Sequence, residues 1–488
     1  METNIYKTFF RGVAWSASMR WVMRGIGFVN IIILARLLSP EAFGVVAMAT
    51  IVIGFITSFT QMGAQQLLIR EQEINSAMIN TAWTILVLQG VLVAIVLLAI
   101  SPLAVSYFGE ERLGAIIFVL SLSCIVDGFF NIGITLARKE LDFALDFRAS
   151  VYTRLSSFVA TLVLVVILRD YWALVYGRLL GSLMGVSISY MVHPYRPRFC
   201  LEYYRKFLAY SSAIIPLKIS RYLNEKLDAI VVGGAASAAT LGIYNIAGDL
   251  AKMFTNEIAA PLGRGLMPGY AKLASDPKEL AIAYARVLAV ATAIILPVGI
   301  GLCLVAEQLV PILLGDQWLD AVPYVMFLSI YATLLSVQRL MSTQILIVSG
   351  HEVRAAILSW SRAILLLVAC IVAAKLYGPL GVAMICPVVG LVMLPVSVIV
   401  LTKSIPISIG GVVAALWRPI LSAFMMATVL FLMPVDLYEN AFFALLLSAL
   451  IGALVYALTM GVSWYAAGKP EGLEYLLEKA LRAKIVRG

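Results

Sequence analysis

The sequence predicts an all-α polytopic membrane protein with fourteen transmembrane helices, and three observations lead there. Hydrophobic residues make up 62% of the 488 residues, and charged residues make up only 13%. A soluble domain is roughly 45–50% apolar and about 25% charged, so this chain has too little polar surface for a soluble protein. The third observation is a series of apolar runs about 20 residues long, the length that crosses a bilayer. Helices are expected because open sheets cannot cross lipid.

The apolar runs follow one another along the chain, separated by short loops rich in Gly, Pro, Ser and charge. Their approximate bounds are 13–37, 41–64, 80–101, 113–136, 147–168, 171–191, 210–233, 241–266, 280–305, 321–348, 355–374, 380–402, 411–432 and 440–464.

Lys and Arg in the loops predict the orientation, because cytoplasmic loops are enriched in both. With the N-terminus in the cytoplasm, the inside segments carry 21 of these cations and the outside loops carry four. The outside loops lean acidic, with Glu41, Glu110 and Asp316 among their residues. Both termini are therefore expected in the cytoplasm.

The sequence contains an internal repeat of six spans. Residues 42–45 (Ala-Phe-Gly-Val) match residues 240–243 (Thr-Leu-Gly-Ile) at an offset of 198. Residues 107–110 match 313–316 at an offset of 206. Six spans is an even number, so the repeats run parallel, which predicts two pseudo-symmetric six-helix lobes around a central cavity plus two extra helices. The predicted segments are 1–195 (first lobe), 196–404 (second lobe), 405–466 (spans 13 and 14) and 467–488 (an amphipathic cytoplasmic tail).

Of the 36 Lys and Arg residues, eleven are not assigned to the inside segments or outside loops and lie deeper within the predicted spans. Each costs about 2.5–3.5 kcal/mol at the bilayer centre, so most must avoid lipid. Four of them, Arg154, Arg178, Arg362 and Arg418, lie close enough to a helix end that they can snorkel to the membrane surface.

The other span cations include members of polar stripes. Arg20 and Arg24 share one face of span 1. Lys218, Arg221, Glu225 and Asp228 follow a helical stripe on span 7, and Asp249 and Lys252 begin one on span 8. Arg20 matches Lys218 at the offset of 198, which predicts an electropositive cavity suited to an anionic, phosphate-bearing substrate. The alternative is that Arg221–Glu225 and Asp249–Lys252 are salt bridges that stabilise their own helices.

Several kinds of chemistry are not expected. The five Cys form no CxxC pair, and the only His residues are His193 and His351, so we expect no zinc site or other metal site. The sequence has no GxxxxGK[ST] phosphate-binding loop. We therefore expect a transporter without a cofactor rather than an enzyme. A Na⁺ or H⁺ gradient is the expected energy source, with Asp127, Asp228, Asp249 and Glu257 as candidate coupling acids.

The N-terminal part resembles bacterial polysaccharide exporters of the Wzx type. The resemblance rests on Gly12 and Trp15, the run Leu-Ala-Arg-Leu-Leu-Ser-Pro-Glu-Ala-Phe-Gly at 34–44, and Gly63. Leu-Gly-x-x-Trp at 314–318, followed by Pro323, resembles a later loop of the same family. The family belongs to the multidrug/oligosaccharidyl-lipid/polysaccharide (MOP, MATE-like) superfamily, and length and span number also agree.

The resemblance implies a flippase that carries an undecaprenyl-diphosphate-linked oligosaccharide repeat unit from the inner to the outer leaflet of the bacterial inner membrane by alternating access. Surface polysaccharide synthesis would use the product. The implied partners are the polyprenyl-diphosphate-linked oligosaccharide, membrane lipids and the polysaccharide polymerase machinery, without nucleic acid. The residues expected at the diphosphate are Arg20, Arg24, Lys218, Arg221, Lys252 and Arg339.

Three alternatives remain open. A lipid II flippase would share the span number and a cationic cavity. A MATE-like cation-coupled drug antiporter would favour an acidic or neutral cavity. A polymerase or ligase of polyprenyl-linked sugars would carry a large outside loop, and no predicted outside loop exceeds about twenty residues.

Overall fold

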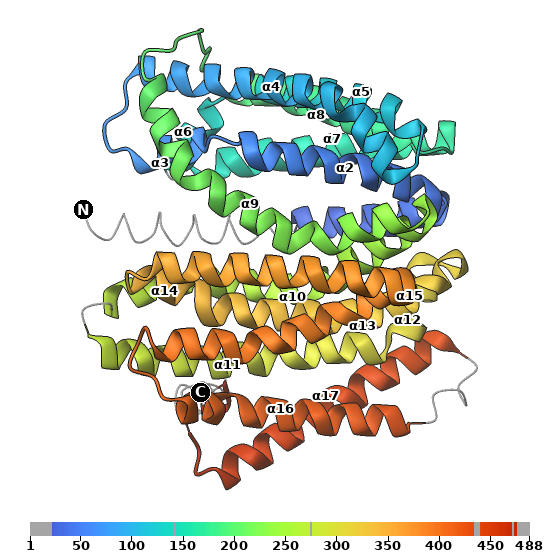
Figure 1. The fold of residues 1–488 in the computed structure, drawn as a ribbon, viewed down its shortest axis with the longest axis vertical. Helices are drawn as coiled ribbons and strands as arrows, with labels where there is room; N and C mark the ends of the chain where they lie inside the picture. Colours follow the sequence, from blue (N-terminus) through green and yellow to red (C-terminus); the bar gives the residue numbers. More distant parts are fainter. Residues whose placement is uncertain (1–21, 141, 274–275, 434–439, 471–472, 476–488) are drawn as a thin grey trace, which may run out of the picture. The chain divides into compact units, whose positions relative to one another are not determined.

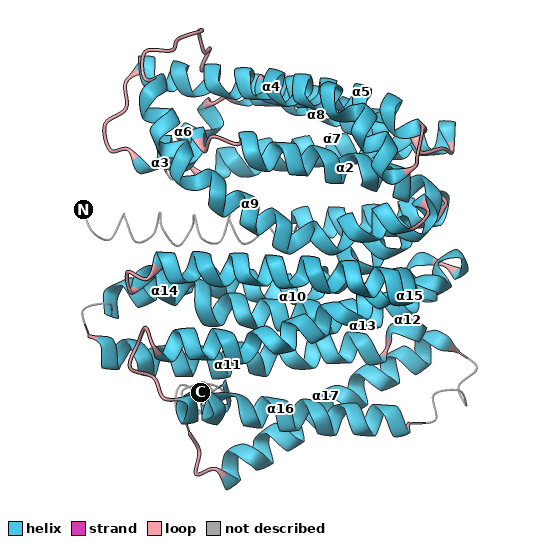
Figure 2. Ribbon diagram, viewed as in Figure 1, coloured by secondary structure: helices cyan, strands magenta, loops and turns pink. Residues whose placement is uncertain are grey.

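The computed structural model describes residues 22–140, 142–273, 276–433, 440–470 and 473–475, and the described part of the chain is helical without strands (Figures 1 and 2). It forms two compact units, Met1–Gly242 (unit 1) and Ile243–Gly488 (unit 2). The expectation of an all-α protein is confirmed for this part. The predicted division at 195/196 concerns the sequence repeat, and it stays a prediction.

Unit 1 begins with a helix whose described part is 22–37. The next helices of the unit are α2 (Pro40–Thr60), α3 (Ala64–Arg70), α4 (Ser76–Phe108), α5 (Arg112–Gly128), α6 (Gly133–Lys139), α7 (Phe143–Leu168), α8 (Trp172–Val192), α9 (Tyr204–Ala235) and the first turn of α10 (Ala238–Leu273). Helix α9 packs against α2, α3 and α4.

Unit 2 takes the rest of α10 and the remaining helices. They are α11 (Pro277–Leu304), α12 (Ala306–Leu314), the short 3₁₀-helix η1 (Asp316–Ala321), α13 (Val322–Gln338), the π-helical turn η2 (Arg339–Thr343), α14 (Gln344–Val348), α15 (Glu352–Thr402), α16 (Ile409–Leu432) and α17 (Ala441–Ala466). Helix α13 packs between α11 and α15, and α16 packs on α11 and α17.

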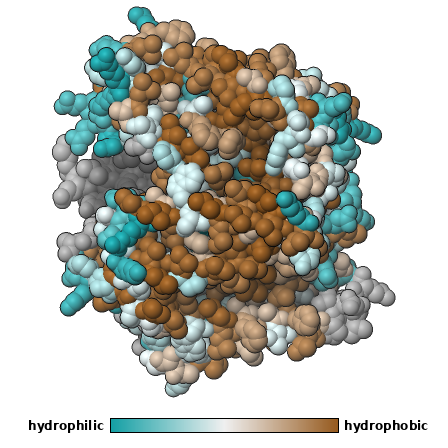
Figure 3. Space-filling view, viewed as in Figure 1, coloured by the Kyte–Doolittle hydropathy of each residue, from teal (hydrophilic) through white to brown (hydrophobic). Residues whose placement is uncertain are grey.

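Nine helices in the described residues are long and apolar enough to cross a membrane, or ten if the bent pair α5 and α6 counts as one span. On the face drawn in Figure 3, hydrophobic side chains cover the middle of each unit, and hydrophilic side chains gather toward the ends. The expectation of a polytopic membrane protein is therefore confirmed.

Two long apolar segments are interrupted by identifiable residues. Between α5 and α6 the chain bends by 55° around Asn131, which is fully buried. The Asn131 side-chain amide donates to the carbonyls of His193 and Tyr195, and its oxygen accepts from the Gly133 amide, so Asn131 connects the bend to the chain that follows α8. Helix α15 breaks at Gly378, whose φ of 64° and ψ of −157° lie outside helical geometry. This break falls between the windows 355–374 and 380–402.

The connection between α8 and α9 is fastened to one face of α4. Asn80 Oδ1 accepts hydrogen bonds from the Tyr195 hydroxyl (2.9 Å) and the Arg198 amide (3.0 Å). One turn later, Thr84 Oγ1 accepts from the Cys200 amide at 2.9 Å. We call residues 193–203 the strap. The strap fixes the start of α9 to unit 1, in keeping with the packing of α9 against α2 and α4.

The two repeat-related turns contact each other. A Cβ added to Gly44 would overlap the carbonyl of Ala238, and a Cβ added to Gly242 would overlap the carbonyl of Pro40. Gly44 corresponds to Gly242, and Pro40 to Ala238, at the offset of 198 found in the sequence. The contact is therefore reciprocal, and each turn requires a glycine because the other backbone lies against it.

Replacing Gly44 by Ala should destabilise the protein by about 1–3 kcal/mol, the usual cost of overpacking, because the added methyl group meets backbone rather than a flexible side chain. Thermal unfolding of the purified protein in detergent measures this effect. Gly301 in α11 is the matched control, because a Cβ there has nothing within 4 Å. Equal unfolding temperatures for G44A and G301A would contradict the close contact.

Candidate functional site: cations within the helices

The polar stripe on α9 exists as a helical face in unit 1. Lys218 Nζ donates to the carbonyl of Gln61 at 3.3 Å, immediately after the last residue of α2. The Lys218 ammonium group therefore lies at the C-terminal end of α2, where the free carbonyl groups of the helix favour a cation. Lys218 is half-buried. Its contact with the end of α2 explains its position without an orientation toward lipid.

The next residues of the stripe form an ion pair and a buried acid. Arg221 Nε lies 3.2 Å from Glu225 Oε1, one turn away, and the Arg221 side chain is 75% exposed. The predicted Arg221–Glu225 salt bridge is thus present. Asn224 and Asp228 are both 2% exposed. The stripe consequently presents an exposed guanidinium at one edge and a buried carboxyl group at the other.

The first helix contributes Arg24, which is partly buried, while Arg20 lies outside the described residues. One turn after Arg24, Gly27 approaches α7. A Cβ added to Gly27 would lie 3.2 Å from Arg154 Nη2. Unit 1 therefore brings a guanidinium of α7 alongside the helix that carries Arg24.

The candidates of unit 2 lie on α10 and in the π-helical turn. Asp249 is exposed and Lys252 is partly buried, on successive turns of α10. Residue 257 belongs to the same helix, but the Glu257 side chain lies outside the described set. Arg339 is the first residue of η2 and is partly buried. π-Helical turns occur frequently at functional sites.

Arg362 was not among the predicted site residues, and the expectation that it snorkels is wrong. Its Nη1 donates to Oε1 of Gln338 at 3.3 Å, and Gln338, 2% exposed, donates to the Gly390 carbonyl at 2.6 Å. Leu366, one turn after Arg362, is fully buried, whereas Ile364 is 60% exposed. Arg362 therefore points away from the lipid-facing side of α15. No spacing along one helix could have identified this contact, because Gln338 lies on another.

Asp127 also has a partner from another helix. Its carboxylate lies 3.0 Å from Nη2 of Arg178 on α8, and the two side chains are 45% and 66% exposed. The sequence offered no nearby cation on the helix of Asp127 itself. Exposed pairs of this kind contribute about 0–1 kcal/mol, so the pair is a weak contact between α5 and α8.

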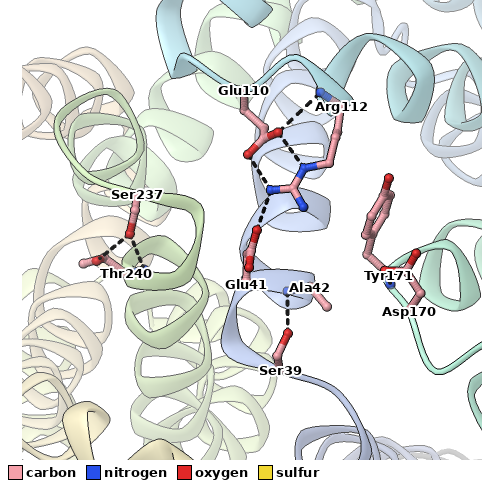
Figure 4. Close-up of polar contacts among 9 residues, drawn as sticks. All are labelled: Ser39, Glu41, Ala42, Glu110, Arg112, Asp170, Tyr171, Ser237 and Thr240. Atoms are coloured by element: carbon pink, nitrogen blue, oxygen red, sulfur yellow. Dashed lines mark hydrogen bonds and ion pairs between the residues drawn. The ribbon is translucent and has the colours of Figure 1, made fainter.

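A polar cluster joins three loops at the end of unit 1 that the sequence places outside (Figure 4). Arg112 Nη2 lies 2.6 Å from Glu41 Oε1 at the start of α2, and Arg112 Nε lies 2.7 Å from Glu110 Oε1. The guanidinium carbon of Arg112 is 5.6 Å from the centre of the Tyr171 ring. Hydrogen bonding from Arg112 lowers the pKa of Glu110, although partial burial opposes the shift. These contacts hold the helix ends together, and we therefore interpret the cluster as structural rather than as a ligand site.

Comparison with known proteins adds a family. The sequence pattern of the polysaccharide biosynthesis protein family matches residues 33–323, more than half of the chain. The lipopolysaccharide biosynthesis protein WzxC of Escherichia coli (strain K12) is 25% identical over 334 residues, which are 67% of each chain. The succinoglycan biosynthesis transport protein ExoT of Rhizobium meliloti (strain 1021) is 24% identical over 65% of each. These matches confirm the Wzx-type resemblance.

Solved structures share the fold. The lipid II flippase MurJ, in its inward closed conformation, gives a TM-score of 0.73 at 14% identity, over 93% of this chain and 99% of that one. An inward-facing multidrug resistance transporter of the MATE family, within the MOP superfamily, gives 0.54 at 16% identity, over 84% and 95%. At such identities the likeness concerns the fold alone.

The Glu110–Arg112 pair should contribute a pH-dependent part of the stability. Because the pKa of Glu110 is lowered in the folded protein, the contribution is present above the ordinary glutamate pKa and disappears as the pH falls through the lowered value. E110Q should therefore reduce the unfolding temperature at pH 7 slightly, by an amount matching about 0–1 kcal/mol, and should have no effect in strong acid.

The neighbouring acid Glu111 is exposed and its side chain makes no capping hydrogen bond, so E111Q serves as the control. A thermal unfolding series in detergent across acidic and neutral pH measures both variants. Identical behaviour of E110Q and E111Q at pH 7 would contradict a contribution from the pair.

Proposed function

We propose, because this chain belongs to the polysaccharide biosynthesis protein family, that it flips a polyprenyl-diphosphate-linked oligosaccharide across a bacterial plasma membrane. The observation that carries the proposal is the stripe on α9, where Lys218 and Arg221 place two cations on one side of a helix of unit 1. Phosphate oxygens accept several charge-assisted hydrogen bonds from such groups. The polysaccharide-related names of the relatives support a saccharide cargo.

The proposed topology has fourteen spans. In this topology α5 and α6 form one span, α13, η2 and α14 form another, and α15 is two spans divided at Gly378. With these assignments, helices occupy the described part of every apolar window. The reciprocal contact of Gly44 and Gly242 supports two parallel repeats. The excess of Lys and Arg in alternate loops supports cytoplasmic termini and a place in the inner membrane.

Transport in this proposal requires no catalytic residue. The cations hold the diphosphate, the oligosaccharide passes through an aqueous path, and the polyprenyl chain stays in lipid while the two repeats alternate access. Undecaprenyl is the proposed lipid. A Na⁺ or H⁺ gradient supplies the energy, with Asp127, Asp228, Asp249 and Glu257 as the acids to test first. The polymerase that extends the repeat units would receive the product on the outer side.

A lipid II flippase is the second candidate, since the fold likeness to MurJ covers nearly the whole chain. The sequence relatives favour the polysaccharide cargo over it. Complementation separates the two, because only a lipid II flippase would restore growth to cells depleted of their own. Rescue of a polysaccharide exporter mutant alone supports the main proposal.

The double variant K218A/R221A should reduce surface polysaccharide strongly and leave lipid-linked repeat units in the inner leaflet. A hydrogen bond to a charged group contributes about 1.5–3 kcal/mol, so each lost cation should weaken cargo binding by about 10- to 100-fold. The measurement is the amount of surface polysaccharide and of accumulated lipid-linked intermediate in a knockout that carries the variant.

R205A is the matched control on the same helix, since Arg205 is exposed and contacts the ring and hydroxyl of Tyr204. Membrane levels of all variants are compared by immunoblot. Normal polysaccharide in K218A/R221A cells with normal protein levels would refute capture of the diphosphate by α9.

A further inference from the structure

The chain turns back sharply after α17. Gly468 and Lys469 have φ values of 78° and 57°, and their amides donate to the carbonyls of Tyr465 and Trp464 at the end of the helix. Lys469 Nζ lies 5.5 Å from the ring centres of both aromatic residues, and Trp464 Nε1 donates to the Pro470 carbonyl at 2.9 Å. These contacts direct the C-terminal segment back toward α16 and α17.

A residue of the returning segment forms a buried ion pair with α16. Glu474 Oε1 lies 2.6 Å from Nη1 of Arg418, and the side chains are 11% and 3% exposed. The expectation that Arg418 snorkels to the membrane surface is therefore wrong. The partner of Arg418 comes from 56 residues later in the sequence, and the guanidinium lies on the packed side of α16 together with Ser422 and Met426.

The pair leaves one donor and one acceptor unused. Arg418 Nε and Glu474 Oε2 are both buried and have no hydrogen-bond partner among the residues that the structure describes. A buried ion pair holds well only when its remaining donors and acceptors are also satisfied. Glu474 is thus a weak ligand for Arg418, since it contacts one end of the guanidinium and not the adjacent Nε.

We propose that Arg418 is a binding site for the phosphate group of an anionic membrane lipid, and that Glu474 is its exchangeable ligand from within the chain. A phosphate offers more acceptor oxygens than a carboxylate and can accept from Nε and an Nη together. Binding of the phosphate displaces the carboxylate of Glu474 and releases residues 473–475 from the helix pair.

A lipid phosphate is favoured over a soluble one by the surroundings of Arg418. Trp417, the preceding residue, is 40% exposed, and Leu421 and Met425, one and two turns after Arg418, are 39% and 40% exposed. These three side chains lie where the packed face that holds Arg418 meets the exposed apolar side of α16. An acyl chain that lies along this apolar side would bring its headgroup beside Arg418. The site is independent of the cations on α9 and of the cargo proposed above.

The experiment measures how fast a water-soluble maleimide labels a cysteine placed at Tyr475, which is 37% exposed and adjacent to Glu474. The full-length Y475C protein is held in maltoside detergent, which has no phosphate, and labelling is quantified for the peptide that contains residue 475. Three additions are compared: phosphatidylglycerol, a neutral glycolipid with the same acyl chains, and inorganic phosphate. E111C, on an exposed loop of unit 1, is the control position.

Phosphatidylglycerol should raise labelling at 475 by about twofold or more, because a position that is 37% exposed in the docked segment becomes fully exposed in the released one. The glycolipid and inorganic phosphate should have no effect, and labelling at 111 should not change. An equal effect of inorganic phosphate would overturn the assignment to lipid. No effect of any addition would overturn the site.

Two background variants test the role of the ion pair. In R418M/E474L the pair becomes apolar, a change that buried ion pairs often tolerate, and labelling at 475 should no longer respond to phosphatidylglycerol. R418K keeps the charge but loses the planar fork, so the response should be reduced. If both variants respond as the parent protein does, Arg418 is not the phosphate ligand.

Discussion

Charged side chains at membrane depth need partners, and this constraint shapes the structure more than any other. Each isolated cation costs about 2.5–3.5 kcal/mol at the bilayer centre. The described cations meet the constraint in different ways. Lys218 donates to a carbonyl at the end of α2, Arg178 pairs with an acidic side chain, and Arg362 donates to the buried amide of a glutamine. In each of these cases the partner lies outside the cation's own helix, so the polar contacts connect neighbouring segments.

Much of the helix content could be predicted from the sequence, because a bilayer demands long apolar runs and the chain has little else. The interruptions were harder to predict. The break between the windows 355–374 and 380–402 coincides with a Gly-Pro pair at 378–379, a readable signal. The bend at Asn131 has no comparable signal, since its amide is satisfied by carbonyls from the end of α8 and the strap, about 60 residues away.

The candidate site was predictable only in part. Periodicity placed Lys218, Arg221 and Glu225 on one face of α9 and anticipated the ion pair between the last two. It could not anticipate Gln338 under Arg362 or Glu474 beside Arg418, because spacing along a helix carries no information on neighbouring helices. Distance from a helix end was a poor guide to exposure: Arg418 lies well inside one face of α16, and rotation about the helix axis decides whether a side chain meets lipid.

The strap has a consequence for any attempt to divide the molecule. From the sequence, residues 193–203 form a polar connection between duplicated halves, the kind of place where a fluorescent protein would be inserted or the gene split for coexpression of two fragments. In the folded chain, however, Asn80 and Thr84 hold its backbone and the Tyr195 hydroxyl. A foreign sequence there would detach this segment from α4. Gene fusions and fragment boundaries are therefore better placed at other loops.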